Sequence, residues 1–233
     1  MAATLKKAIF FDAGDTLFEV QGGVGIQYSR IAKRHGMVVD AAILEQRFRK
    51  AFNLSPPMAF SGVMASEVTA HERKWWEAIV TAAFEEYVVS DTFFEEVYTF
   101  FEGLEAWTLF PEVIEVIEDL TAAGFYLGVI SNFDSRLDAI CEGLKIRRFF
   151  QSMTISAQEG WAKPSPEIFK RALDKSGFKP EQSIHIGDSL YHDVKGANLS
   201  GITPILVDRK GHHQDEKGLI SVPHLKEIFG YLR

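Results

Sequence analysis

The chain has a single cysteine among its 233 residues and no hydrophobic run long enough to cross a membrane. One cysteine excludes an intrachain disulfide framework and agrees with a reducing compartment, and we expect Cys141 to pack in a helix rather than to act in catalysis. The apolar stretch in MAATLKKAIFFDAG is too short for a signal peptide or a membrane span. These absences predict a soluble, cytoplasmic protein with no membrane partner.

Positive charge is also scarce, because 25 Lys and Arg residues face 32 Asp and Glu residues and leave a formal charge of −7. No basic stripe is present that could neutralise a run of phosphates, so nucleic acid is not expected as a partner. Hydrophobic residues make up 46% of the chain and charged residues 24%, which is typical of a globular protein with a sizeable core. The length suits one core domain with an insertion.

Short apolar segments that end in polar turns recur along the chain, as expected for buried parallel strands. They cover residues 7–11, 126–130, 151–155, 183–186 and 204–207. Helices with clear start and stop signals are predicted at 111–123, which ends at Gly124, and at 165–176, which ends at Gly177. The pattern predicts an α/β fold with a Rossmann-like parallel sheet, whose ligands bind beyond the carboxyl ends of the strands.

The interval from residue 20 to residue 104 carries helical patterns but no convincing strand. We therefore predict an α-helical cap domain at 20–104, inserted into a core formed by 1–19 and 105–233. The clearest cap helix lies around 67–87, and its apolar stripe, which includes Trp76 and Val80, is expected to pack in the cap core rather than to form a ligand site. Hinges are expected near 22–25 and 104–109.

Polar residues directly follow several of the predicted strands, where a ligand site is expected. Each has an ordinary explanation by itself, such as a helix cap, a first-turn acid or a surface lysine. Their combination and order are more informative than any one of them. The residues are Asp12, Ser131, Asn132, Lys163, Asp188 and Asp193.

In this order, Asp12, Ser131, Lys163 and the Asp188/Asp193 pair resemble the four motifs of the haloacid dehalogenase-like hydrolase superfamily, in its helical-capped branch. The segments FFDAGDTL, VISNFD, GWAKPSPEIF and HIGDS carry the resemblance, which spans about residues 8–207. The resemblance implies a parallel sheet in which motifs one, two and four lie on adjacent strands, beneath a helical cap.

The resemblance also implies a Mg²⁺ ion held by the Asp12 carboxylate, the Gly14 carbonyl and Asp188, with Asp193 helping directly or through water. A physical argument agrees, because carboxylates about 4 Å apart repel by several kcal/mol per pair at an effective dielectric constant of about 20. A cation is needed to hold them together. Ligands that are all oxygen favour Mg²⁺, which takes one or two carboxylates plus a substrate phosphate.

The implied reaction is phosphatase chemistry on a small phosphorylated metabolite. Asp12 would attack phosphorus as an already ionised carboxylate and form an aspartyl-phosphate that water hydrolyses. Lys163 would neutralise nucleophile and phosphate, while Ser131 and Asn132 bind phosphoryl oxygens. Thr16 is also assigned to the substrate site.

The chain departs from the family pattern at Gly14, where phosphatases of the family usually carry a second aspartate that protonates the leaving group. Asp15 occupies the position that is usually glycine. General acid–base help is typically worth about 10²–10⁴-fold in rate, so we expect a slow phosphatase. We favour a turn-stabilising role for Asp15 over an acid–base role, because aspartate commonly stabilises turns.

Two other functions remain as alternatives. A metal-independent 2-haloacid dehalogenase also lacks the second aspartate, although the acidic segment GDSLYHD suits Mg²⁺ better. A catalytically weak pseudo-phosphatase would bind a phosphorylated ligand or a protein through the cap. His185 and His192 are expected to serve packing or to lie at the surface. The sequence does not decide between a monomer and a homodimer.

Overall fold

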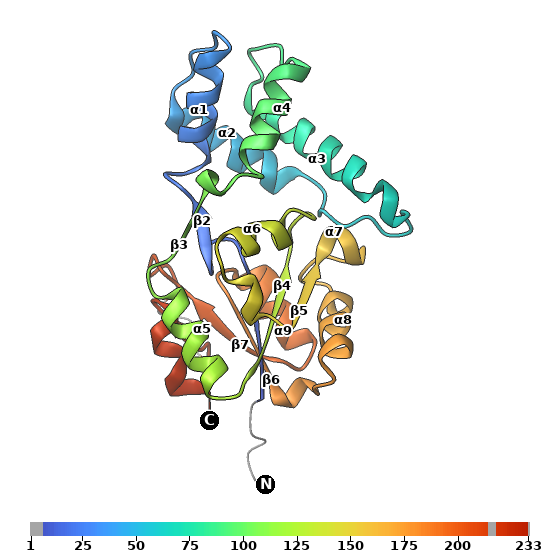
Figure 1. Cartoon of the computed structure of the whole chain (residues 1–233), viewed down its shortest axis with the longest axis vertical. Coiled ribbons are helices and arrows are strands. Elements are labelled where there is room, and N and C mark those ends of the chain that lie inside the picture. The colour runs from blue at the N-terminus through green and yellow to red at the C-terminus, as the bar shows by residue number, and fades with distance from the viewer. Residues whose placement is uncertain (1–6, 214–217, 233) are drawn as a thin grey trace.

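The computed structural model describes residues 7–213 and 218–232. An α/β core carries a helical insertion that lies over the carboxyl ends of the strands of its sheet (Figure 1). The six strands of the sheet follow the order β5-β4-β1-β6-β7-β8, and every neighbouring pair is parallel. They are β1 (Ala8–Phe11), β4 (Tyr126–Ser131), β5 (Ser152–Ile155), β6 (Ser183–Gly187), β7 (Thr203–Val207) and β8 (Ser221–Val222). The predicted α/β sheet is confirmed, and its five predicted strands lie within one residue of the observed bounds.

Helices cover both faces of the sheet. Alternate side chains of β1 point to opposite faces, so each face presents apolar side chains that helices cover. Ile9 and Phe11 pack with α5 (Val113–Ala122) and α6 (Leu137–Gly143). Ala8 and Phe10 pack with α8 (Pro166–Ser176) and α9 (Lys195–Leu199). The short helix α7 (Ser156–Glu159) follows β5. Cys141 is buried within α6, which confirms its predicted place in helix packing.

The boundaries of α8 illustrate how local sequence signals define a core helix. The Ser165 side chain accepts a hydrogen bond from the Glu167 backbone N–H, and Pro166 occupies the first turn, where a missing N–H is not needed. Gly177 ends the helix with a φ of 72°, a left-handed conformation that glycine adopts without strain. The loop that precedes this helix carries Lys163.

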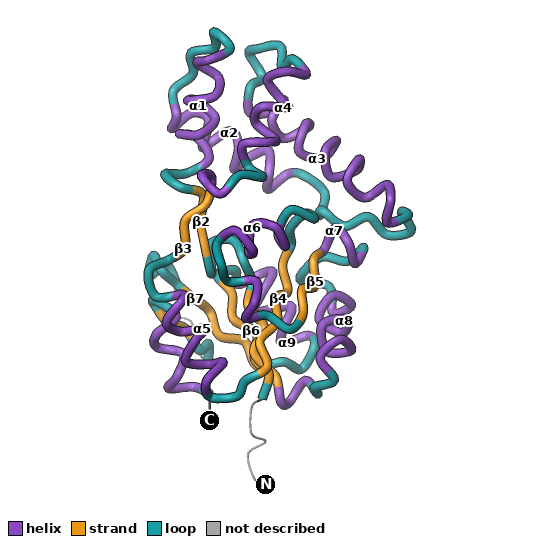
Figure 2. The backbone as a smooth tube through the Cα atoms, in the orientation of Figure 1, coloured by secondary structure: helices purple, strands orange, loops and turns teal. Residues whose placement is uncertain are grey.

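The insertion consists of four helices, α1 (Val24–Arg34), α2 (Ala41–Leu54), α3 (Val68–Ala83) and α4 (Asp91–Phe100). Two short strands, β2 (Phe18–Val20) and β3 (Trp107–Leu109), pair antiparallel and connect these helices to the core (Figure 2). In the described part of the chain, no strand from the insertion joins the six-stranded sheet. The predicted helical insertion is therefore confirmed. The domain division at residues 20 and 104 and the hinges stay predictions.

The apolar stripe of α3 is divided between two environments. Ile79, Val80 and Ala83 are almost completely buried in the cap, as predicted. Trp76 is only half-buried, and its indole N–H donates to Asp134 Oδ2 of the core, 2.6 Å away. The helix ends at Ala83 rather than near residue 87. One end of the stripe therefore packs within the cap and the other contacts the core.

Residues just beyond β4 hold the cap against the core. Glu72 of α3 accepts hydrogen bonds from both the backbone N–H and the hydroxyl of Ser135. Arg136 pairs with Asp134 and donates to the Tyr98 carbonyl of α4, 3.1 Å away. The cap is thus positioned by the segment that follows the second predicted motif. Within the described ranges, no helix combines the length and apolarity that crossing a membrane requires.

Candidate active site

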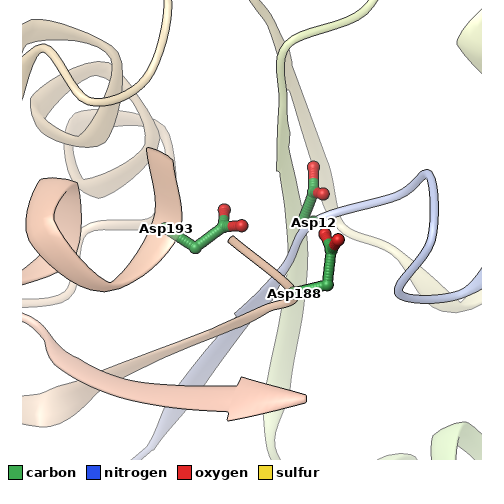
Figure 3. Close-up of side chains that lie close together, drawn as sticks. All are labelled: Asp12, Asp188 and Asp193. Carbon is green, nitrogen blue, oxygen red and sulfur yellow. The ribbon is translucent and has the colours of Figure 1, made fainter. Parts of the chain in front are cut away.

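Three aspartates converge at the carboxyl edge of the sheet (Figure 3). Asp12 follows β1, and its backbone N–H donates to the Ile186 carbonyl of the adjacent strand β6 at 2.8 Å. Asp188 follows β6 directly, and Asp193 lies in the helical turn Leu190–Val194. One carboxylate oxygen from each lies within 4.8 Å of the others. The family resemblance predicted this convergence, and the positions of the residues at strand ends agreed with it.

Lys163 lies between two of these carboxylates. Its Nζ donates to Asp12 Oδ1 at 2.7 Å and to Asp193 Oδ1 at 2.6 Å, and its side chain is only 2% exposed. Burial alone would lower the pKa of this ammonium, but the charges of Asp12 and Asp193 outweigh burial and raise the pKa. Lys163 therefore stays protonated and supplies a buried positive charge beside Asp12.

The Asn132 side chain fixes the backbone of Lys163. Its Oδ1 accepts from the Lys163 N–H at 2.7 Å, and its Nδ2 donates to the Lys163 carbonyl at 2.9 Å. The amide thus ties the end of β4 to the loop before α8. The structure gives Asn132 this positioning role, while its predicted contact with substrate stays a prediction. Ser131, the last residue of β4, is buried at the same edge of the sheet.

Asp193 is held in place by groups, among them His185, to which the sequence assigned no role in the site. His185 Nε2 lies 2.8 Å from Asp193 Oδ1 and donates to it, because a carboxylate only accepts. The Ser189 backbone N–H donates to the other oxygen at 3.0 Å. A Cβ on Gly187 would lie 2.2 Å from Asp193 Cγ, so only glycine permits this close approach. Although burial raises the pKa of Asp193, Lys163 and His185 reverse the effect and hold the pKa below its usual range.

Asp188 has no lysine partner in the described residues and receives only a long contact of 3.5 Å from the Thr16 hydroxyl. Burial, followed by the charges of Asp12 and Asp193, raises the pKa of Asp188 to about 8. One ammonium therefore faces three carboxylates. The donor set consists of carboxylate oxygens with uncompensated negative charge, which fits a hard divalent cation such as Mg²⁺.

The turn after Asp12 contains the exchanged residues Gly14 and Asp15. Asp15 has a φ of 57°, in the left-handed region that glycine adopts without strain. Its backbone N–H donates to the Phe18 carbonyl at 2.8 Å, and its side chain faces a cavity beneath the cap. Burial, followed by the charge of Asp12, raises the pKa of Asp15. No atom lies within 4 Å of a Cβ built on Gly14, so a side chain fits there.

The chain matches the family model for haloacid dehalogenase-like hydrolases over residues 6–201. It is 32% identical to haloacid dehalogenase-like hydrolase domain-containing protein 3 of Bos taurus, over 97% of this chain and 94% of that protein. The glyceraldehyde 3-phosphate phosphatase of Methanopyrus kandleri is 36% identical over 46% of each chain. The predicted resemblance to the family is confirmed, and the likeness to domain-containing protein 3 extends over nearly the whole chain.

Solved structures show the same fold. A magnesium-bound HAD hydrolase from Bacillus subtilis superposes with a TM-score of 0.77 at 18% identity, covering 98% of this chain and 99% of that one. The L-2-haloacid dehalogenase of Xanthobacter autotrophicus gives a TM-score of 0.72 at 15% identity, with 96% and 97% covered. Because a magnesium-bound hydrolase and a dehalogenase match almost equally well, the fold alone does not choose between phosphatase and dehalogenase reactions.

The uncompensated charge at the aspartate cluster predicts how the protein responds to Mg²⁺. A ligand at about 100-fold above its dissociation constant stabilises the native state by about 2.7 kcal/mol, which raises the melting temperature of a chain this long by roughly 5–10 °C. Asp188→Asn should lose most of that rise. Asp119→Asn, an exposed substitution on α5, should retain it. Thermal melting with and without Mg²⁺ measures both.

The same variants test the charge on Asp188 without metal. Because its folded-state pKa lies near 8 rather than 3.8, ionisation of Asp188 destabilises the metal-free fold progressively as the pH rises through that range. Asp188→Asn should therefore raise the metal-free melting temperature more at pH 8.5 than at pH 5. An unchanged Mg²⁺ response in Asp188→Asn would remove Asp188 from the metal site.

Proposed function

The chain belongs to the haloacid dehalogenase-like hydrolase family, and from this premise we propose that it is a Mg²⁺-dependent phosphatase of small phosphorylated metabolites. The observation that carries the proposal is the arrangement of Lys163 between Asp12 and Asp193, with Asp188 uncompensated beside them. A buried ammonium next to a carboxylate nucleophile offsets the repulsion that an incoming phosphate would meet. With a divalent cation also bound, the cluster would suit a dianionic substrate.

In the proposed reaction, an oxygen of Asp12 attacks phosphorus, and the bond between phosphorus and the leaving oxygen breaks with its electron pair on that oxygen. Water then attacks the aspartyl-phosphate, which releases inorganic phosphate and restores the carboxylate. Lys163 and Ser131 would bind the phosphoryl oxygens as their charge redistributes. Mg²⁺, held by Asp12, Asp188 and the Gly14 carbonyl with Asp193 directly or through water, would supply positive charge against the phosphate.

Two relatives support this proposal by what they bind or hydrolyse. The Methanopyrus relative is a phosphatase, and the Bacillus structure holds magnesium. The charge balance of the cluster also favours a phosphatase over a metal-independent dehalogenase. Without a cation, ionised Asp188 would face two further buried carboxylates with only Lys163 to offset them. Such an arrangement is costly unless a further positive charge is bound.

Glycine at position 14 is expected to limit the rate of phosphate-ester hydrolysis, because it has no acidic side chain. The leaving group receives no proton from this position, so substrates with a stabilised leaving group should react faster than alkyl phosphates. Asp15 is the other candidate acid, since its raised pKa favours a protonated carboxyl. Its left-handed backbone, a conformation in which aspartate is enriched among residues other than glycine, favours a role in the turn instead.

A hydrolysis screen tests the proposed function directly. Purified protein should release phosphate from an activated aryl phosphate such as 4-nitrophenyl phosphate only when Mg²⁺ is present, and it should release no halide from a 2-haloacid. Asp12→Asn should abolish phosphate release. Halide release without metal would establish the dehalogenase instead. Binding of phosphate esters with no turnover would favour a pseudo-phosphatase.

Exchanging residues 14 and 15 tests the missing acid. The double variant Gly14→Asp with Asp15→Gly should raise kcat/KM for an alkyl phosphate by ~10-fold or more, because it restores general acid–base help. Space is available at position 14, and glycine suits the φ of position 15. The gain with 4-nitrophenyl phosphate should be smaller. If the wild type hydrolyses alkyl phosphates rapidly and Asp15→Asn alone destroys that activity in a folded protein, Asp15 is the acid–base group.

A further inference from the structure

A cavity of about 450 Å³ lies between the cap and the core, and aromatic side chains are the largest class in its wall. Of the 24 residues that line the cavity, 10 are Phe, Tyr or Trp. Aromatic residues are therefore enriched there, since they form only 12% of the chain. They come from both parts of the molecule, as with Tyr28 and Phe48 of the cap helices and Phe133 of the core. The indoles of Trp76 and Trp107 also line it. Such a wall favours a flat apolar ligand.

The cavity adjoins the phosphoryl site where the leaving group departs. Gly14 and Asp15, which follow the nucleophile Asp12 in the chain, form part of its wall. In an in-line displacement, the leaving oxygen lies opposite the attacking oxygen. Asp12 follows β1 at the carboxyl edge of the sheet, and the cap lies over that edge (Figure 1). The leaving group of a substrate attacked by Asp12 would therefore depart toward the cap.

Three of the six charged residues of the wall, Arg136, Glu45 and Arg49, are engaged by protein partners, and the other three are Asp15, Glu19 and Lys210. Arg136 pairs with Asp134 and stacks over the ring of Tyr98 at 4.2 Å. Glu45 accepts from the Gly25 backbone N–H and pairs with Arg49. A sugar or polyol in the aromatic part of the cavity would leave hydroxyl groups without partners, which costs free energy. A ring with few polar atoms meets no such cost.

We propose that the substrates of this site are phosphate monoesters of phenols or similar flat aromatic alcohols, with the ring in the aromatic cavity and the phosphate beside Asp12. This rests on the proposed phosphatase function. Gly14 supports it independently of the cavity, because an aryloxide leaves without a proton from the enzyme. As the bond from Asp12 to phosphorus forms, the bond to the aryl oxygen breaks. The aryloxide keeps the electron pair and takes its proton from water, and a second water hydrolyses the aspartyl-phosphate.

The test separates recognition of the ring from the acidity of the leaving group. The two substrates are 2-naphthyl phosphate and acetyl phosphate, whose acetate also leaves without a proton but carries no ring. With Mg²⁺, KM for 2-naphthyl phosphate should be at least ~10-fold lower, since apolar contacts with a matched pocket discriminate on that scale. Calorimetric titration with 2-naphthol, the product alone, measures ring binding independently of turnover.

Variants of residues that line the cavity test whether the ring binds there. Val80→Phe narrows the cavity from α3, and Val24→Phe narrows it from the less buried start of α1. Each variant should bind 2-naphthol ~10-fold or more weakly than the wild type. The comparison uses variants whose melting temperature equals that of the wild type, so that unfolding does not cause the loss. Val88→Phe is the matched control. Val88 belongs to the same cap but is 92% exposed and does not line the cavity, so 2-naphthol binding should change less than about 2-fold.

The outcomes distinguish the ring proposal from the phosphatase proposal. Mg²⁺-dependent hydrolysis of acetyl phosphate with no preference for 2-naphthyl phosphate, and no binding of 2-naphthol, overturns the aromatic substrate class and leaves the phosphatase standing. The same follows if the two cavity variants bind 2-naphthol as tightly as Val88→Phe does. Binding of 2-naphthol that depends on Val80, without hydrolysis of either phosphate, overturns the phosphatase and with it the substrate class.

Discussion

The buried ammonium of Lys163 is the interaction on which the arrangement of the site depends. It joins Asp12 after β1 to Asp193 after β6, residues that would otherwise repel each other in a region shielded from water. Removing one partner from a buried ion pair typically costs about 3–5 kcal/mol, because the remaining charge is uncompensated. Asn132 fixes the lysine backbone, and Gly187 leaves the space that Asp193 needs. The sheet order brings all of these groups to one edge.

The same charge balance connects the fold to the chemistry. One ammonium does not neutralise three carboxylates, so the cluster fits a divalent cation, and the proposed function uses that cation to bind phosphate. The cap is held by Asp134 and Ser135, which closely follow Asn132, the residue that fixes the Lys163 backbone. Its aromatic wall therefore lies above the turn that contains Gly14. In the proposed function, phosphate binding in the core and ring binding beneath the cap would meet at the position where the usual acid is absent.

Much of this arrangement was predictable from sequence because parallel strands bring the residues after them to one edge. Apolar runs located the strands and the edge where a ligand site is expected, and the family resemblance implied that Asp12, Asp188 and Asp193 meet there. The β2–β3 pairing and β8 escaped prediction, since strands of two or three residues have no measurable periodicity. The contact between His185 and Asp193 depends on how the turn after β6 folds back. Periodicity also identified the buried face of α3. It could not identify the cavity that Val80 lines, because hydrophobic periodicity shows which face of a helix is buried and not whether a cavity lies between that face and the core.

The covalent intermediate on Asp12 is the most direct measure of this account. Because Gly14 supplies no base to activate water, hydrolysis of the aspartyl-phosphate should be slow, and the intermediate should accumulate during turnover. Rapid acid quenching with an aryl phosphate and Mg²⁺, followed by peptide mass spectrometry, should find one added phosphoryl group on the peptide that contains Asp12. The adduct should be absent without Mg²⁺ and in Asp12→Asn. Steady phosphate release with no phosphoryl group on that peptide at any quench time would contradict the account.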